Sequence, residues 1–133
     1  MSRARLLIVS NRLPVTAHLS GGEVRLSAAS GGLATGLRPW HEGSGGLWIG
    51  WPGDTSRFSA DQQADLDRQL AARGIVPVAL SAEHVTRYYH GFANRVLWPL
   101  FHYLIDRVPV HATGWEAYRQ VNETFARAVI RQY

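Results

Sequence analysis

The sequence contains no cysteine and no lysine, so all fourteen of its basic residues are arginine. Without cysteine the chain has no disulfide framework and no thiolate chemistry, which fits a reducing compartment. No apolar run approaches the roughly 18 residues that a membrane-spanning helix needs, and the N-terminus lacks the apolar core of a signal peptide. These absences favour a cytoplasmic protein that has no membrane partner.

Charged residues are also scarce. They make up 18% of the 133 residues, while 46% are hydrophobic. This composition excludes a disordered chain and allows one domain with a buried core. The net charge is +4, but the arginines are scattered along the chain. Nucleic-acid-binding surfaces are usually clustered basic patches, so we expect no nucleic-acid partner, although single arginines can still bind a phosphate.

Three apolar segments indicate strands of a parallel sheet. Residues 5–10 are apolar enough for a central strand that is covered on both faces. A second buried strand is predicted at 47–51 and a third at 75–80, where Pro77 favours an edge position. Residues 13–28 have the glycines and the alternation of a loop and a short hairpin. The pattern predicts an α/β fold with part of a Rossmann-like parallel sheet.

Helices are predicted between and after these strands. Ser30 is a candidate N-cap for a helix over 32–40, and Ser59 for a helix over 60–73 with a thin apolar face. A further helix opens at Ser81. The last helix begins near Gly114, where Thr113 and Glu116 have the spacing of a capping box. The apolar face predicted for this last helix consists of Trp115, Tyr118, Phe125 and Val129.

The adjacent glycines Gly31 and Gly32 follow the first strand and open a predicted helix. Glycine lets a ligand approach the backbone closely, and the first N–H groups of a helix attract anions. A strand, a loop and a glycine-opened helix therefore fit a phosphorylated ligand. A plain turn explains the glycine pair equally well.

Motifs of common catalytic and metal sites are absent, among them HExxH, the Walker loop, GxSxG and paired cysteines. The six histidines do not have the spacing of metal ligands, so we predict no metal site, no cofactor and no catalytic residue in this chain. The abundant tryptophan and tyrosine residues can fill a core. Beside glycine loops, they also suit a cleft that binds sugars.

Several ordered blocks resemble the N-terminal part of trehalose-6-phosphate synthases. The blocks are residues 8–14 (IVSNRLP), 30–37 (SGGLATGL), 46–53 (GLWIGWPG), 88–94 (YYHGFAN), 97–103 (LWPLFHY) and 115–122 (WEAYRQVN). The resemblance implies a retaining glycosyltransferase of the GT-B type, with two Rossmann-like domains facing each other across a cleft. It also implies transfer of glucose from UDP-glucose to glucose 6-phosphate, so that the partners are a nucleotide sugar and a sugar phosphate.

The resemblance assigns roles to six residues. Arg12, Tyr89 and Trp98 would line the acceptor site and hold the sugar phosphate, and Trp51 would form a wall of the same pocket. The glycine pair 31–32 would lie on the loop that reaches the donor. Arg12 also fits on independent grounds, because open α/β sheets bind ligands at the carboxyl ends of their strands and a guanidinium suits a phosphate.

The resemblance extends only to the N-terminal, acceptor-side domain. We expect residues 1–133 to be an incomplete form of that domain, without the donor-binding domain and its basic diphosphate clamp. The chain alone is then expected to be inactive and to self-associate as a homo-oligomer. Two alternatives remain: a related synthase with another acceptor, such as glycerol 3-phosphate or a pseudo-sugar phosphate, and a phosphosugar-binding module without catalysis.

Overall fold

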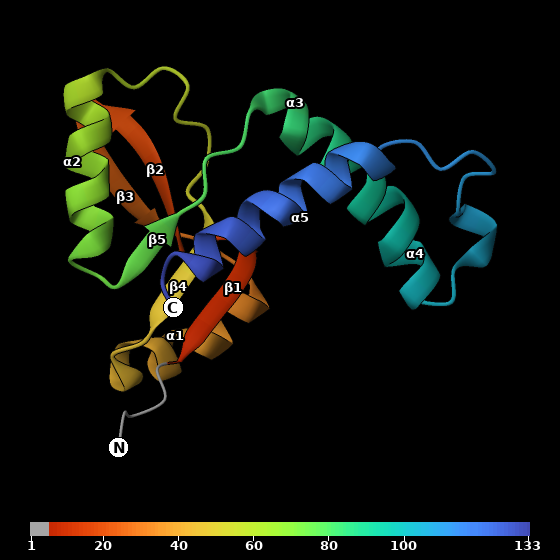
Figure 1. The fold of residues 1–133 in the computed structure, drawn as a ribbon, viewed down its shortest axis with the longest axis horizontal. Coiled ribbons are helices and arrows are strands. Elements are labelled where there is room, and N and C mark those ends of the chain that lie inside the picture. The colour runs from red at the N-terminus through yellow and green to blue at the C-terminus, as the bar shows by residue number, and fades with distance from the viewer. Residues whose placement is uncertain (1–5) are drawn as a thin grey trace. The chain divides into compact units, whose positions relative to one another are not determined.

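A computed structural model describes residues 6–133 of the chain (Figure 1). The chain divides into two compact units, one made of residues 6–79 with 128–133 and the other of residues 80–127. Within the described residues, every strand belongs to the first unit. The second unit is helical.

The first unit contains a parallel sheet, as predicted, in the order β1-β4-β5. Its strands are β1 (Leu7–Arg12), β4 (Leu47–Trp51) and β5 (Ile75–Pro77). The prediction that residues 5–10 form the central strand is wrong for the part described, because β4 lies in the middle and β1 at an edge. Residue 5 lies outside the described residues. Val9 on β1 is 47% exposed, consistent with an uncovered edge strand.

The third strand lies at the other edge, as Pro77 predicted, but it is shorter than residues 75–80. Proline has no N–H to donate, so the ladder cannot continue regularly through it. The N–H of Val78 still donates to the carbonyl oxygen of Gly50 at 2.7 Å. The predicted hairpin is present as β2 (Val15–Ser20) and β3 (Glu23–Ala28), which pair antiparallel.

Two helices accompany this sheet, α1 (Gly32–Ser44) and α2 (Ala60–Ala71). The prediction of Ser30 as N-cap is wrong, because Gly31 occupies that position and no side chain caps the helix. α1 also continues beyond residue 40 and ends where Gly45 takes the left-handed conformation. Ser59 caps α2 as predicted, in a capping box with Gln62.

The core of the first unit joins the sheet, the hairpin and α2. Leu66 and Leu70 form the thin apolar face of α2, and both are fully buried. Burying each such leucine contributes about 1.5–3 kcal/mol to folding. The buried residues of this cluster are Ile8, Leu13, Ala17, Val24, Trp48, Leu66, Leu70 and Ile75.

The second unit begins with one continuous helical segment made of α3 (Ala82–His84), η1 (Val85–Leu97) and α4 (Trp98–Phe101). The side chain of Ser81 accepts a hydrogen bond from the N–H of His84, so this helix opens where the sequence predicted. The middle part, η1, has π-helical hydrogen bonding. A short 3₁₀ turn, η2 (Ile105–Arg107), follows.

The last helix, α5 (Trp115–Ile130), begins where it was predicted, but its buried face differs from the prediction. Phe125 is buried as expected, whereas Trp115 is 57% exposed. The rings of Trp115 and Tyr118 instead pack against Phe92, with centroid distances of 5.7 and 5.0 Å. The buried positions of α5 are Ala117, Val121, Phe125 and Ala128. The capping box of Thr113 and Glu116 stays a prediction.

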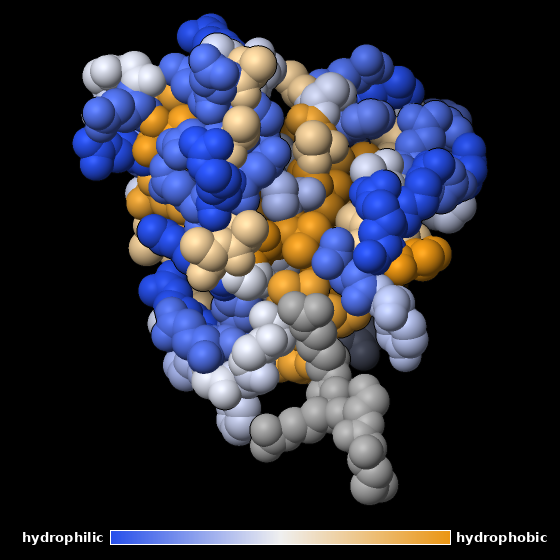
Figure 2. Space-filling model, turned by 60° about the vertical axis from the view of Figure 1, so that its left-hand side comes forward, coloured by the Kyte–Doolittle hydropathy of each residue, from blue (hydrophilic) through white to orange (hydrophobic). Residues whose placement is uncertain are grey.

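Hydrophobic residues reach the molecular surface among the hydrophilic ones (orange and blue in Figure 2). In the first unit the exposed large hydrophobic side chains include Val9 on β1 and Leu33 and Trp40 on α1. In the second unit they include Phe101, Tyr103 and others. No helix in residues 6–133 is both long enough and apolar enough to cross a membrane.

Candidate acceptor and donor site

Arg12 and Trp51 lie side by side at the carboxyl ends of adjacent strands. They are register partners of β1 and β4, and the guanidinium carbon of Arg12 lies 5.9 Å from the centroid of the Trp51 ring. This is a cation–π arrangement, in which the ring face attracts the cation. Arg12 remains exposed, and Trp51 is half-buried. The structure therefore brings together two of the four residues predicted for the acceptor site.

A register shift in β1 sets the position of Arg12. Val9 pairs with Ile49 and Arg12 pairs with Trp51, so β1 has one residue more than β4 over this stretch. Such bulges redirect a side chain and are common beside functional sites.

Ser10 holds this irregular stretch through its side chain. The hydroxyl accepts a hydrogen bond from Nε1 of the buried Trp48 at 2.8 Å and donates one to the carbonyl oxygen of Arg12 at 2.6 Å. It thereby links the backbone at Arg12 to the core. The position of Ser10 between an apolar run and Arg12 is the sequence signal that could have identified this role.

Gly50 allows β4 to approach β1 at the same place. A Cβ at Gly50 would lie 2.7 Å from the carbonyl oxygen of Ser10 and 3.1 Å from the side chain of Leu13. No real Cβ tolerates the first of these distances, so any other residue would push the two strands apart. The N–H of Leu13 also donates to the carbonyl oxygen of Trp51 at 3.0 Å, which ties the two strand ends together.

Three buried polar atoms at these strand ends have no hydrogen-bond partner within residues 6–133. They are Nδ2 and Oδ1 of Asn11 and Nε1 of Trp51. Buried polar groups are nearly always paired, and leaving one unpaired costs about 1–3 kcal/mol. These atoms therefore mark the strand ends as a place where a further polar partner is expected. No sequence motif named above singles out Asn11.

Gly31 and Gly32 lie at the start of α1, as predicted. Gly31 is the N-cap and has a φ of 148°, which L-residues with a side chain rarely adopt. A Cβ on either glycine would meet nothing within 4 Å, so the space beside this backbone is open. The first N–H groups of a 13-residue helix face outward here without a side-chain cap. This arrangement suits an anion.

Tyr89 and Trp98 both belong to the helical segment of the second unit. Tyr89 is half-buried and contacts the ring of His90 edge to face, with centroids 5.1 Å apart. Trp98 is 50% exposed and stacks on His102, with ring centroids 4.1 Å apart and an interplanar angle of 19°. Nδ1 of His102 lies 2.7 Å from the carbonyl oxygen of Trp98, which fixes the stack.

Trp98 lines a hollow of about 410 Å³ within the second unit. Two arginines, Arg95 and Arg107, line it as well, with Asn94. An aromatic face beside two guanidinium groups suits a ligand that carries both a sugar ring and a negative charge. Neither Arg95 nor Arg107 was predicted as a site residue. The signal was their position beside the aromatic block of 97–103.

Burial raises the pKa of Tyr88, and the neighbouring phenols of Tyr118 and Tyr89 raise it further. No group of three His, Cys, Asp or Glu side chains within residues 6–133 is arranged to hold a metal ion.

Comparisons with known proteins agree with the resemblance seen in the sequence. The sequence model of Glycosyltransferase family 20 matches residues 4–133 of the chain. An alpha,alpha-trehalose-phosphate synthase [UDP-forming] of Aspergillus fumigatus is 38% identical over 98% of the chain and 25% of its own length. A bifunctional trehalose-6-phosphate synthase/phosphatase of Thermoproteus tenax is 42% identical over 95% of the chain and 18% of its own length.

Solved structures give the same result. The trehalose-6-phosphate synthase OtsA superposes with a TM-score of 0.66 at 28% identity, over 98% of this chain and 26% of that protein. A UDP-forming alpha,alpha-trehalose-phosphate synthase from Burkholderia vietnamiensis gives 0.62 at 26% identity over the same shares. The chain thus spans about a quarter or less of the length of these relatives. Because the family match covers nearly every residue, the chain belongs to glycosyltransferase family 20.

Proposed function

We propose that this chain is the acceptor-side part of a retaining glycosyltransferase that makes trehalose 6-phosphate. Glucose is transferred from UDP-glucose to glucose 6-phosphate, and UDP leaves. The relatives' names, which describe trehalose-phosphate synthases that form UDP, support this donor and product. The pairing of Arg12 with Trp51 at the ends of two parallel strands is the observation that carries the proposal.

In this proposal Arg12 binds the phosphate of the acceptor. Its guanidinium is exposed and lies over an indole ring, so it has free donors for phosphate oxygens while its position is restrained. The unpaired Nε1 of Trp51 provides one more N–H in the same region. Tyr89 and Trp98 stay candidates for the acceptor site on the resemblance alone.

The glycine-opened start of α1 receives the donor. Open space beside Gly31 and Gly32 lets a sugar diphosphate reach backbone N–H groups, and the helix dipole favours its negative charge. Breaking the bond between glucose and UDP puts charge on the leaving diphosphate, which preorganised cations must stabilise. We assign no residue of this chain to that task, and so we expect no glucosyl transfer from the chain alone.

The proposal is tested by supplying UDP-glucose and glucose 6-phosphate to the chain alone and to a complete synthase that carries it as its N-terminal part. We expect trehalose 6-phosphate and UDP only from the complete synthase. Calorimetry with glucose 6-phosphate on the chain alone should still show binding that Arg12→Ala weakens. Turnover by the chain alone would contradict the proposal that the groups stabilising the leaving diphosphate lie outside this chain. Transfer to glycerol 3-phosphate instead of glucose 6-phosphate would contradict the proposed acceptor.

A further inference from the structure

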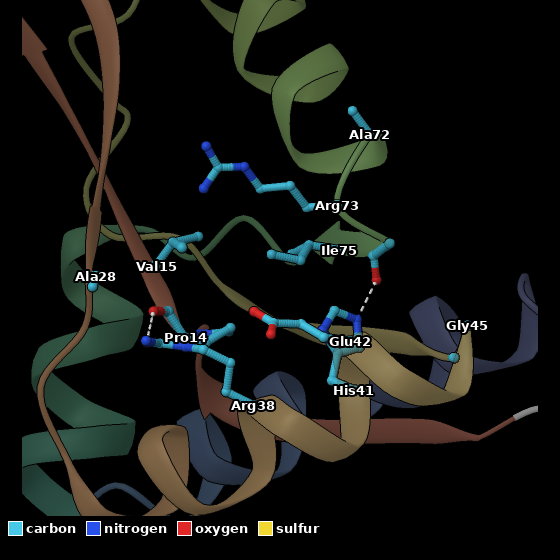
Figure 3. Close-up of a pocket in the computed structure, with 12 residues that line it drawn as sticks. Pro14, Val15, Ala28, Arg38, His41, Glu42, Gly45, Ala72, Arg73 and Ile75 are labelled. Carbon is cyan, nitrogen blue, oxygen red and sulfur yellow. Dashed lines mark hydrogen bonds between the residues drawn. The ribbon is translucent and has the colours of Figure 1, made fainter.

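A hollow of about 550 Å³ opens on the first unit and contains none of the residues discussed for the acceptor or the donor (Figure 3). One wall is the second half of α1, with Arg38, His41 and Glu42. Another is the turn between α2 and β5, with Arg73. This volume lies within the range of sites for small molecules and is far larger than a single phosphate needs.

Charged side chains project into this hollow from two sides. Figure 3 shows Arg73 reaching in from the turn between α2 and β5, and Glu42 reaching in from α1. Within residues 6–133, neither the guanidinium of Arg73 nor the carboxylate of Glu42 takes part in a hydrogen bond or an ion pair. Arg38 makes one long hydrogen bond, 3.4 Å, to the carbonyl oxygen of Pro14, which leaves most of its donors free.

The wall behind these side chains is well ordered by its own contacts. His41 is buried, and its Nε2 donates to the carbonyl oxygen of Gly74 at 3.1 Å. Its ring also meets the ring of Trp48 edge to face at a centroid distance of 5.5 Å. A hydrogen bond thus joins α1 to the turn before β5 at the hollow.

The chemistry of the hollow selects its ligand. Two guanidinium groups with free donors suit a doubly charged phosphate, because each can present two N–H groups to its oxygens. The carboxylate of Glu42 would repel a bare anion but accepts hydrogen bonds from hydroxyl groups. We propose that this hollow is a second binding site, for a small phosphorylated polyol whose phosphate contacts Arg38 and Arg73 and whose hydroxyl donates to Glu42.

Calorimetric titration tests this with glycerol 3-phosphate and inorganic phosphate as probes, in an Arg12→Ala background that removes the proposed acceptor phosphate contact. We expect saturable binding of glycerol 3-phosphate that Arg73→Gln weakens about tenfold or more. Arg57→Gln is the matched control, because it removes an exposed guanidinium outside the hollow, and it should leave binding unchanged. Glu42→Gln should weaken glycerol 3-phosphate yet strengthen inorganic phosphate.

A second measurement does not depend on variants. In nitrogen-15 spectra of the unmodified chain, glycerol 3-phosphate should shift the N–H signals of Gly45, Gly46 and Gly74, which line the hollow. Equal binding by Arg73→Gln and Arg57→Gln would overturn the site. So would loss of all binding in the Arg12→Ala background, which would place the probe at the acceptor site and leave the proposed function intact. Equal effects of Glu42→Gln on both probes would contradict the proposed hydrogen bond between a polyol hydroxyl and Glu42.

Discussion

In the first unit Arg12 lies at the end of a strand that hydrogen bonds hold to the core, whereas in the second unit Trp98 is half-exposed on a helix. In the first unit, backbone register and the Ser10 hydroxyl hold Arg12 in place. In the second unit, stacking on His102 holds Trp98. The guanidinium of Arg12 is thus held at the end of a sheet strand, while the aromatic face of Trp98 is carried by a helix.

The units also differ in how completely they bury their hydrophobic residues. The first unit encloses Trp48 entirely, and its sheet, hairpin and α2 share one core. The second leaves Tyr103 at 90% and Val110 at 94% exposure. Substitutions in the first unit should therefore change stability and site geometry together, whereas substitutions at the exposed aromatics of the second should change mainly binding.

The largest effect is expected at the start of α1. Gly32→Val in a complete synthase should lower turnover on the order of 10²-fold, because a displacement of about 1 Å at a reacting centre costs that much. Thermal unfolding should change little, since a Cβ there meets nothing within 4 Å. Gly36→Val, with equally open space further along α1, is the control. If both variants lost the same activity, the donor role of Gly32 would be wrong.

The next largest effect is expected for Arg12→Ala in a complete synthase. Losing a charge-assisted contact to phosphate costs about 1.5–3 kcal/mol, or roughly 10- to 150-fold in the acceptor KM. The KM for UDP-glucose should hardly change. Tyr89→Phe in the second unit removes only a neutral hydroxyl and should cost less, about 0.5–1.5 kcal/mol. Steady-state kinetics with both substrates varied decides this; a rise confined to the donor KM would refute the assignment.

Stability should fall when the link between Arg12 and the core is removed. Ser10→Ala leaves Nε1 of the buried Trp48 without an acceptor, at a cost of about 1–3 kcal/mol in the free energy of unfolding. Ser27→Ala removes only an exposed contact of 3.4 Å and serves as control. Urea unfolding measures both. Equal midpoints would show that the Ser10 bridge does not hold the strand end.

The smallest effect concerns pH and the second unit. Hydrogen bonds from Arg119 and Gln120 hold the pKa of Glu116 below its ordinary value. The pKa of Glu116 is thus lower in the folded state than in the unfolded state. The contribution of these hydrogen bonds to stability is therefore fully present above the pKa of the unfolded state, and it is lost as the pH falls through the pKa of the folded state. Since the Glu116 side chain is 55% exposed, solvent screens most of this contribution. Glu116→Gln should flatten the acid side of the stability curve slightly, and an unchanged acid side would show that these contacts do not stabilise α5.

The sequence predicted most of the first unit because its signals are local. An apolar run, a glycine turn and a serine cap each specify an element, so the parallel strands, the hairpin and α2 were predicted correctly. The order of the strands depends on contacts far apart in sequence, and there the central position given to residues 5–10 was wrong. The cap of α1 was wrong because Gly31, by adopting a positive φ, takes the place that Ser30 was expected to fill.

The candidate site was predicted unevenly for the same reason. Arg12 and Trp51 could be chosen from motif resemblance, and the structure brings them together. The roles of Ser10 and Gly50 follow from the distance between two strands, which no single motif states. Trp115 was predicted on the buried face of α5 but is largely exposed. Helical spacing identifies the apolar residues on one side of a helix, but it does not tell which of them lies at the edge of the buried face.

The extra residue in β1 changes the phase of the strand. Side chains alternate between the two faces of a sheet, so Ile8 and Arg12, four positions apart, would share a face in a regular strand. Ile8 pairs with Trp48, but Arg12 pairs with Trp51, three positions further along β4 and so on the opposite face. Regular pairing from Val9 onward would instead place Arg12 opposite residue 52, on the same face as Ile8 and away from its position beside Trp51. The register shift therefore decides on which face of the sheet Arg12, the residue proposed to bind the acceptor phosphate, projects.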